Sequence, residues 1–386
     1  MLLATVCAVA VATIYVAQPV LAQLGQDLGV PEADLGWIVT AGQLGYLVGL
    51  ATLVPLGDLL DRRRLITGHL LLAAVGMLAA AASPNLPLLL ISLAGTGLVA
   101  VVVQTAVAFA ADLSTPAERG RTLGVVTSGV ILGILGARIL AGVLADWWGW
   151  RTVYLTLAVL LVALSILVLK LLPADHRPAR RTYGAVMSSL GHLFRDPLFV
   201  SRGLIAFFLF ASFGTLWSGL ALPLAADPWH LSTAQTGLFG IAGLAGALGA
   251  VRAGRWADAQ RANAVAGGGL VLLAASWIAT GQANWSLGLV VIGVVVLDFA
   301  VQAVHVSNQS LLTAAHPDRT SSVIGGYMIF YALGSALGAI TTTTAYALAG
   351  WTGSAILGAV FAGGGLITWA VSRHSVARRE TGARNP

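Results

Sequence analysis

The sequence is poor in charge, since Asp, Glu, Lys and Arg make up 9% of its 386 residues, whereas 58% are hydrophobic. Soluble globular proteins carry about 25% charged residues, because a surface exposed to water needs them. A fold of this size in water could not cover so much apolar side chain. The composition therefore excludes a soluble protein and indicates an integral membrane protein.

Cysteine is almost absent as well. Cys7 is the only one, which rules out a disulfide framework or a cysteine metal site within the chain. The sequence has no GxxxxGK[ST] phosphate-binding loop, no cluster of metal-ligating residues and no pairing of a nucleophile with a base. We therefore expect no metal and no other cofactor, and no enzymatic reaction. The pI is near 10.0, but the basic residues form small clusters between apolar runs, so we expect no nucleic acid partner.

Long apolar runs fill the rest of the chain, and a membrane-spanning helix needs about 20 such residues. The first run is interpreted as a span and not as a signal peptide, because no basic residues precede it and many more runs follow. The expected spans are 3–23, 35–56, 65–83, 86–110, 122–145, 152–172, 198–221, 233–252, 264–281, 286–311, 322–346 and 352–372.

The basic residues test this topology. When alternate loops are assigned to one side, beginning with 57–64, that side holds all 21 Lys and Arg residues except Arg138 and Arg151. Cytoplasmic loops carry such an excess, and one span too many or too few would scramble it. We therefore predict twelve spans in the inner (cytoplasmic) membrane with both termini in the cytoplasm. We expect the protein to act as a monomer in the lipid bilayer.

The predicted fold is an all-α integral membrane protein made of two pseudo-symmetric six-helix bundles. The segment 116–124, "PAERGRTLG", aligns with 317–325, "PDRTSSVIG", in the second half. Duplicated halves that enclose a site near the membrane midplane are typical of transporters. The expected division is an N-terminal bundle, a cytoplasmic linker with an amphipathic helix, a C-terminal bundle and a cytoplasmic tail, with bounds 1–172, 173–197, 198–372 and 373–386.

One cytoplasmic loop carries a recognisable motif. It reads Gly57, Asp58, Leu59, Leu60, Asp61, Arg62, Arg63, Arg64, and a degenerate copy in the second half reads Gly254, Arg255, Trp256, Ala257, Asp258. This pattern resembles the loop between spans two and three of the major facilitator superfamily, Gly-x-x-x-Asp-Arg-x-Gly-Arg-Arg, without its second glycine. The likeness runs over essentially the whole chain, and it implies transport by alternating access with this loop as a gate.

The charges of the loop also have a direct interpretation. Asp61 and Asp258 are predicted at helix ends beside arginines, where charge-assisted pairing can latch one helix to its neighbour. The alternative is that the arginines only anchor the loops on the cytoplasmic side.

Glycines recur every three or four residues in several spans, which places them on one helix face where helices pack closely. The resemblance implies that these faces form the contact between the two halves. Residues 129–151 also resemble the span-five motif of the drug/proton antiporter branch of the family, without its proline. The packing glycines we single out are Gly129, Gly133, Gly136, Gly334 and Gly338.

Arg138, Asp298 and His305 are the ionisable residues predicted deep within spans. A charge at the centre of a bilayer costs about 2.5–3.5 kcal/mol, so such residues are usually functional or paired. Asp298 and His305 are seven residues apart and so share a helix face. Burial disfavours the charged form of a carboxyl group, and imidazole titrates near neutral pH, so both are candidates to carry a coupling proton.

Each of these residues has an alternative interpretation. Asp298 could instead be a structural partner that neutralises Arg138, and His305 a polar residue satisfied by neighbouring helices. Arg138 could bind an anionic group of a substrate, or pair with Asp298 as a lock that depends on the conformational state.

Other polar side chains in the spans are candidates to line a substrate cavity, although such residues often only hydrogen-bond to a neighbouring helix. Gln18, followed by Pro19, predicts a break in the first span, and Gln104 aligns with His305 in the repeat. The candidates are Tyr15, Gln18, Gln43, Tyr46, Gln104, Trp217, Gln302 and Asn308.

The sequence thus predicts a secondary active transporter, with efflux of a small organic or drug-like compound in exchange for protons. One alternative is uptake or facilitated diffusion of a small metabolite. An alternative of another class is a non-transporting membrane receptor or scaffold, which would not need Asp298 and His305 within its spans.

Overall fold

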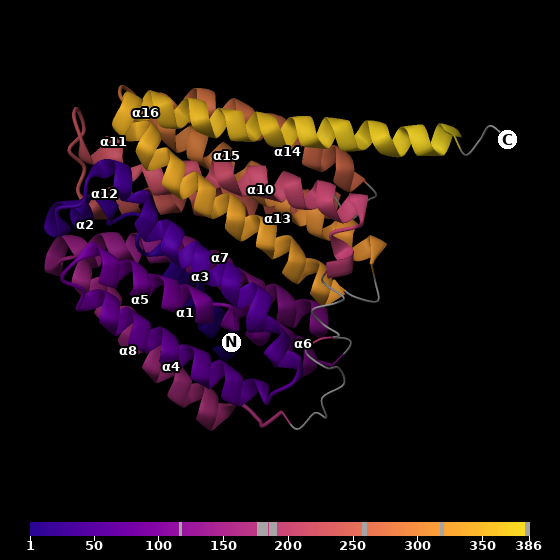
Figure 1. Cartoon of the computed structure of the whole chain (residues 1–386), viewed down its shortest axis with the longest axis horizontal. Helices are drawn as coiled ribbons and strands as arrows, with labels where there is room; N and C mark the ends of the chain where they lie inside the picture. The colour runs from indigo at the N-terminus through magenta and orange to yellow at the C-terminus, as the bar shows by residue number, and fades with distance from the viewer. Residues whose placement is uncertain (116–117, 176–183, 185–190, 257–260, 317–319, 383–386) are drawn as a thin grey trace.

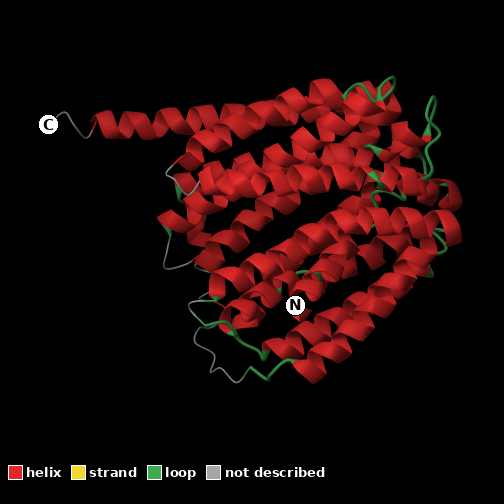
Figure 2. Ribbon diagram, turned by 180° about the vertical axis from the view of Figure 1, so that it is seen from behind, coloured by secondary structure: helices red, strands yellow, loops and turns green. Residues whose placement is uncertain are grey.

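A computed structural model describes residues 1–115, 118–175, 184, 191–256, 261–316 and 320–382. Helices make up nearly all of this part of the chain, which contains no β-strand. Figure 2 shows the helices running roughly parallel or antiparallel to one another, as an all-α membrane fold requires. In lipid, a helix satisfies its backbone hydrogen bonds internally, which explains this architecture.

The N-terminal half contains the predicted spans one to six. Its elements are α1 (Leu2–Tyr15), α2 (Leu21–Leu28), the 3₁₀ turn η1 (Glu32–Asp34), α3 (Gly36–Thr52), the 3₁₀ turn η2 (Val54–Asp58), α4 (Arg62–Ala81), α5 (Leu86–Val99), α6 (Val102–Asp112), α7 (Arg119–Trp148) and α8 (Trp150–Leu171).

The C-terminal half contains spans seven to twelve. Its elements are α10 (Pro197–Gly219), α11 (Ala221–Ala225), α12 (Thr233–Gly237), α13 (Phe239–Trp256), α14 (Ala262–Thr280), α15 (Leu287–Ala315) and α16 (Thr320–Gly382).

The helices agree with the twelve-span prediction. Among the described residues, nine helical stretches are long and apolar enough to cross a membrane, and Leu2–Tyr15 and Thr233–Leu248 are shorter apolar helices. The last long stretch, Ser322–Arg373, contains two spans, because the helix kinks at Ala349 and Gly350. Gly350 has a φ of 60°, a left-handed conformation that glycine adopts without a steric penalty.

Local sequence explains where several helices begin and end. Asp61, Asn85, Asp196, Ser232 and Ser286 each accept a hydrogen bond from a backbone N–H in the first turn of the helix that follows. The first span is broken between Tyr15 and Leu21, as Gln18 and Pro19 predicted. Proline lacks an amide hydrogen and cannot continue the α-helical bonding pattern, so the chain unwinds there.

The two halves lie side by side and diverge towards one end. This is the linker end, where α4 and α10 begin and α8 ends; in Figure 1 it lies on the right, and α2, α11 and α12 mark the opposite end on the left. The halves contact each other mainly through α3 against α16 and through α7 against α12 and α13. The contacts are therefore made by spans two, five, eight and eleven, as the family resemblance implied.

The predicted packing glycines have a different place from the one expected. Gly129 and Gly133 lie against the backbone of Ala4 and Ala8 in α1, and Gly334 and Gly338 lie against Phe207 and Ala211 in α10, while Gly136 faces open space. They bring helices together within a half and do not form the contact between halves. That contact uses other glycines, Gly36 against Ala339 and Gly142 against Thr233.

The linker and the tail are described only in part. Most of the expected linker helix, residues 176–183 and 185–190, lies outside the described residues. At its end, Phe194 packs against Phe199 and Phe330 of the C-terminal half. The expected tail, 373–386, begins as a continuation of α16, which runs to Gly382 and projects beyond the bundle in Figure 1.

Candidate functional site

A polar site lies where the two halves meet, and four of the residues singled out in the sequence form its centre. Gln18 comes from the break between α1 and α2, Arg138 from α7, and Asp298 from α15. Trp217, near the end of α10, joins them. Arg138 and Asp298 are only 2% and 3% exposed, so the site holds two opposite charges away from solvent.

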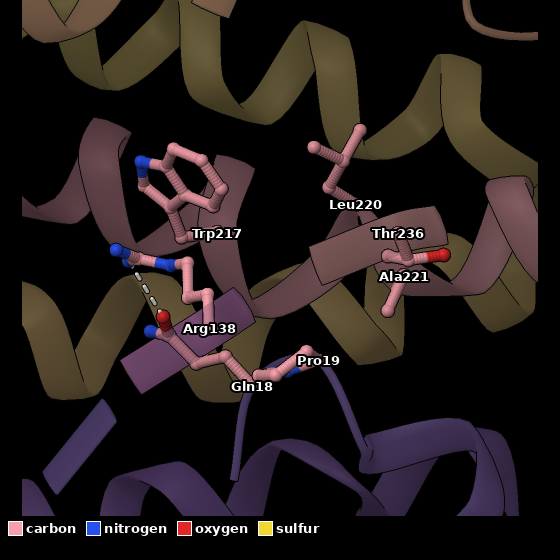
Figure 3. Close-up of a pocket in the computed structure, with 7 residues that line it drawn as sticks. All are labelled: Gln18, Pro19, Arg138, Trp217, Leu220, Ala221 and Thr236. Carbon is pink, nitrogen blue, oxygen red and sulfur yellow. Dashed lines mark hydrogen bonds between the residues drawn. The ribbon is translucent and has the colours of Figure 1, made fainter. Parts of the chain in front are cut away.

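Arg138 is held by neutral groups. Its Nη2 donates to Gln18 Oε1 at 2.8 Å, and its Nη1 donates to the Ile134 carbonyl at 3.0 Å. The guanidinium carbon lies 3.8 Å from the centre of the Trp217 ring, a cation–π contact between the halves. Figure 3 shows this indole beside the guanidinium and the hydrogen bond to Gln18. Gln18 also reaches the other half, since its Nε2 donates to Ser218 Oγ at 3.4 Å.

Asp298 is bonded to the same indole. Trp217 Nε1 donates to Asp298 Oδ1 at 3.1 Å, whereas Oδ2 has no hydrogen-bond partner in the part of the chain that the structure describes. The carboxylate packs against Gly243 of α13, where a Cβ would collide with Oδ2 and come within 2.8 Å of Trp217 Cζ2. Because Gly243 has no side chain, α13 leaves room for the hydrogen bond between Asp298 and Trp217.

A direct pair of Arg138 and Asp298, one of the alternatives that the sequence left open, is absent from the described residues in this conformation. Within the described part of the chain, neither residue forms an ion pair. Trp217 joins them instead, with its ring face on Arg138 and its N–H on Asp298. Trp217 was among the predicted cavity candidates, but its contacts with Arg138 and Asp298 were not predicted, because they join residues about 80 positions apart in the sequence, on α7, α10 and α15.

A small pocket opens beside Arg138. It is lined by Gln18, Pro19, Arg138, Trp217, Leu220, Ala221 and Thr236, and its cavity volume is about 10 Å³. Pockets that hold drug-sized ligands are usually about 300–1,000 Å³. In this conformation the pocket has room for about one water molecule next to the guanidinium, so a ligand enters only when the halves move.

His305 lies in a second polar cluster, two helical turns from Asp298. Its Nδ1 is 3.1 Å from Tyr327 Oη, and its Nε2 is 3.1 Å from Gln309 Nε2. Its ring also contacts Phe210 edge to face, with ring centroids 5.2 Å apart. Asp298 and His305 thus both face α10, on the shared face that their spacing predicted, but the partners of His305 all belong to the C-terminal half.

The remaining cavity candidates are distributed over both halves. Gln104 Nε2 donates to Tyr46 Oη at 2.9 Å, a hydrogen bond within the N-terminal half. Gln43 and Asn308 are buried, and Gln302 is half-buried. Tyr15 joins the site, with its ring centre 5.6 Å from the guanidinium carbon of Arg138.

The gating motif is built differently from the prediction for Asp61. This carboxylate caps its own helix, since Oδ1 accepts from the Arg64 N–H at 3.0 Å, and Oδ2 accepts from the Asp175 N–H at 3.3 Å. The latch to a neighbouring helix is made by Arg62, which pairs with Asp112 at the end of α6 and donates to the Gly57 carbonyl.

The other motif residues complete the loop in part. Arg63 donates to the Leu172 carbonyl at 3.2 Å, and Arg64 is exposed. The side chains of Asp58 and Arg255, the surroundings of Gly254, and Asp258 lie outside the described part of the structure.

Sequence reasoning overlooked several residues at the end opposite the linker. Asp146 of α7 accepts hydrogen bonds from the N–H groups of Thr233 and Ala234 in α12, at 2.9 and 3.0 Å. Thr343 of α16 accepts from the Gly36 N–H and donates to the Ala33 carbonyl, both at 3.1 Å. These bonds cross between the halves, and an isolated Asp or Thr near a loop gives no sequence signal of such a partner.

Buried polar residues near the linker end were also missed. Arg202 was counted with the loops, but it is 6% exposed and donates to Asn263 Oδ1 at 2.9 Å. His69 in α4 is 4% exposed. Both lie near the ends of apolar runs, so the sequence did not distinguish them from residues expected at the membrane–water interface.

A fold of two six-span halves with a polar site between them defines a membrane transporter. The family model of the Major Facilitator Superfamily matches residues 1–339, and the chain belongs to this superfamily. It is 41% identical over 361 residues to the uncharacterized transporter YgaY of Escherichia coli (strain K12), covering 93% of this chain and 92% of that protein.

Two further likenesses complete the comparison. Over 161 residues, 40% of this chain and 28% of the other, it is 37% identical to the multidrug resistance protein B homolog of Mycobacterium tuberculosis (strain H37Rv). The fold matches a bacterial homolog of the human lysosomal transporter Spinster, in an inward-facing and unoccupied conformation, with a TM-score of 0.80. That match covers 98% of this chain and 96% of the other at 15% identity.

Proposed function

We propose that this protein is a proton-coupled secondary active transporter of the cytoplasmic membrane that moves a small organic compound by alternating access. Asp298 is the proposed proton site. The observation that carries the proposal is its position: a buried carboxylate with one unpartnered oxygen, joined through Trp217 to Arg138 of the opposite half. A group at this place can connect its protonation to the arrangement of the halves, because its neighbours separate when the halves move.

The cytoplasmic membrane and cytoplasmic termini are supported by the distribution of Lys and Arg in the loops. The linker end is then the cytoplasmic end. The contacts of Asp146 and Thr343 lie at the other end, so the described conformation holds the halves together on the outer side.

Efflux in exchange for protons is the first proposed direction. The likeness to a multidrug resistance protein homolog supports it, although that likeness covers 40% of this chain. Uptake together with a proton is the second candidate, and it is supported by the charges at the site: Arg138 and Asp298 are buried in one cluster without a direct ion pair.

Flux into proteoliposomes tests the proposal. The purified protein is reconstituted, a pH gradient is imposed in either direction, and a panel of labelled small organic compounds is screened for accumulation. We expect at least one compound to accumulate only with a gradient, and Asp298→Asn to abolish this gradient-dependent accumulation. Asp34→Asn, at an exposed site in η1, is the matched control. Accumulation that Asp298→Asn leaves intact would contradict the proposal.

A further inference from the structure

A further inference rests on the uncharged groups that contact Arg138. Its hydrogen-bond acceptors are an amide oxygen and a backbone carbonyl, and the rings of Trp217, Tyr15 and Phe213 lie 3.8 to 5.9 Å from the guanidinium carbon. A charge removed from water is costly unless an opposite charge compensates it. The positive charge of Arg138 is therefore compensated only indirectly by the groups that the structure describes around it.

The charge of the site depends on one proton. Asp298 is the opposite charge near Arg138, and Trp217 stands between them as the shared neighbour. With Asp298 ionised, the two charges compensate each other. With Asp298 protonated, Arg138 is the only charge of the pair and the site is positive, because guanidinium keeps its charge in proteins.

Among the described residues, the groups around the pair contain no other charge that could take over either role. Arg138 on α7 and Trp217 on α10 face Asp298, Gly243 of α13 closes the side of its unpartnered oxygen, and Tyr15 of α1 lies beyond Arg138. Tyr15 is neutral in the ordinary pH range. Among the described residues, protonation of Asp298 is thus what changes the charge of this cluster.

The pocket is the place where a ligand can reach the positive charge of Arg138. Gln18 and Thr236 supply polar side chains to its wall, Pro19, Leu220 and Ala221 supply apolar surface, and Arg138 lies beside Gln18 and Trp217. Guanidinium pairs well with carboxylate and other oxyanions, and the charge-assisted bonds that form are roughly twice as strong as neutral ones. A cationic ligand would instead meet the repulsion of Arg138 at close range.

We infer that the site takes its substrate as an organic anion, whose anionic group binds Arg138, and that this anion binds together with a proton on Asp298. The inference rests on the proposed proton coupling and adds the substrate class and the sign of the coupling. An ionised Asp298 competes electrostatically with the anion for Arg138, so each bound anion favours one bound proton. Because an anion and a proton that travel together are driven inward by an inward proton gradient, this inference selects uptake over exchange.

Binding at several pH values tests the inference without transport. The probe is benzenesulfonate, which stays ionised throughout, with benzenesulfonamide as the uncharged match and benzyltrimethylammonium as the cationic match. For the protein in lipid nanodiscs, one proton taken up per anion makes the sulfonate Kd rise about tenfold per pH unit above the titration of Asp298. The two matched probes should bind much more weakly and show no such slope.

Two variants give signatures that general damage would not produce. Asp298→Asn carries a neutral side chain at every pH, so its sulfonate affinity should equal the acid-pH value of the wild type and lose the slope. Arg138→Gln should lose sulfonate binding at all pH values. Arg151→Gln is the matched control, because Arg151 pairs with Asp27 at the opposite end and does not line the pocket. Melting of each variant in nanodiscs shows whether it is folded.

The outcomes separate the inference from the proposed function. If the cation or the neutral probe moves with protons in an Asp298-dependent manner while the sulfonate does not bind, proton coupling stands and the anion assignment is overturned. Sulfonate binding without a pH slope, or binding lost in folded Asp298→Asn, overturns the sign of the coupling. Sulfonate binding that Arg138→Gln retains overturns the role of Arg138.

Discussion

Asp298 and His305 lie two turns apart on one face of α15, yet they are built into different surroundings. Asp298 has a contact path into the other half, through the Trp217 indole to Arg138, and one of its oxygens has no partner. Both ring nitrogens of His305 have partners, Tyr327 and Gln309, from its own half. Being ionisable and within a span is therefore not enough for coupling, because the group must also lie where the halves change their contacts.

The largest effect on transport is expected when a side chain fills the space beside Asp298. Gly243→Ala places a Cβ against Asp298 Oδ2 and within 2.8 Å of Trp217 Cζ2. Overpacking of this kind costs about 1–3 kcal/mol, so we expect gradient-driven transport to fall about 10- to 100-fold. The measurement is the initial rate in proteoliposomes. Gly136→Ala, a helical glycine of α7 that faces open space, is the matched control and should keep the wild-type rate.

A change at Trp217 sharpens the comparison by removing one bond. Trp217→Phe keeps an aromatic face for Arg138 but has no N–H to donate to Asp298. A hydrogen bond to a charged group contributes about 1.5–3 kcal/mol, so the rate of gradient-driven transport should fall about tenfold or more. Trp277→Phe removes a comparable bond to Ser212 inside the C-terminal half, at 2.8 Å. If both variants lower the rate equally, the indole has no special part in coupling.

The bond of Asp146 tests the contact between halves at the outer end. Asp146→Asn removes the negative charge at the start of α12, an interaction worth about 0.3–1 kcal/mol, and should shift the halves about two- to fivefold towards opening there. The readout is alkylation of Thr236→Cys, a pocket position, by a reagent added outside. The control is Asn85→Ala, which removes a cap inside one half. Equal labelling with and without Asp146 would show that this bond does not hold the outer end closed.

The smallest effect is expected at His305. His305→Gln keeps a side chain that can bond to Tyr327, and a neutral hydrogen bond contributes only about 0.5–1.5 kcal/mol, so the rate should fall by less than about tenfold. Accumulation in a pH gradient should persist, measured beside Asp298→Asn. Complete loss of accumulation with retained exchange would instead give His305 the coupling role.

The sequence predicted the fold well because each step is local or statistical. The prediction used features that lie close together along the chain: runs of apolar residues, the excess of Arg in alternate loops, and the break at Gln18 and Pro19. The site was predicted in part: Arg138 and Asp298 were singled out because a buried charge in lipid is rare. Which groups surround them depends on how the two halves are packed, which no spacing along one helix reveals.

The errors have the same origin. Gly129 and Gly334 lie on close-packed faces, as their spacing indicated, but spacing does not show whether the neighbour is in the same half. Asp61 was predicted to latch a neighbouring helix because it stands beside arginines, whereas its backbone position makes it a helix cap and Arg62 takes the pairing role.

Simultaneous recording of substrate and proton movement tests the central claim most directly. Proteoliposomes containing a pH-sensitive dye are given a transported compound from the panel, and both fluxes are followed for the wild type, Asp298→Asn and His305→Gln. We predict that Asp298→Asn exchanges the compound across the membrane but moves no protons with it, while His305→Gln still moves both. Proton movement that accompanies the compound in Asp298→Asn would contradict the account.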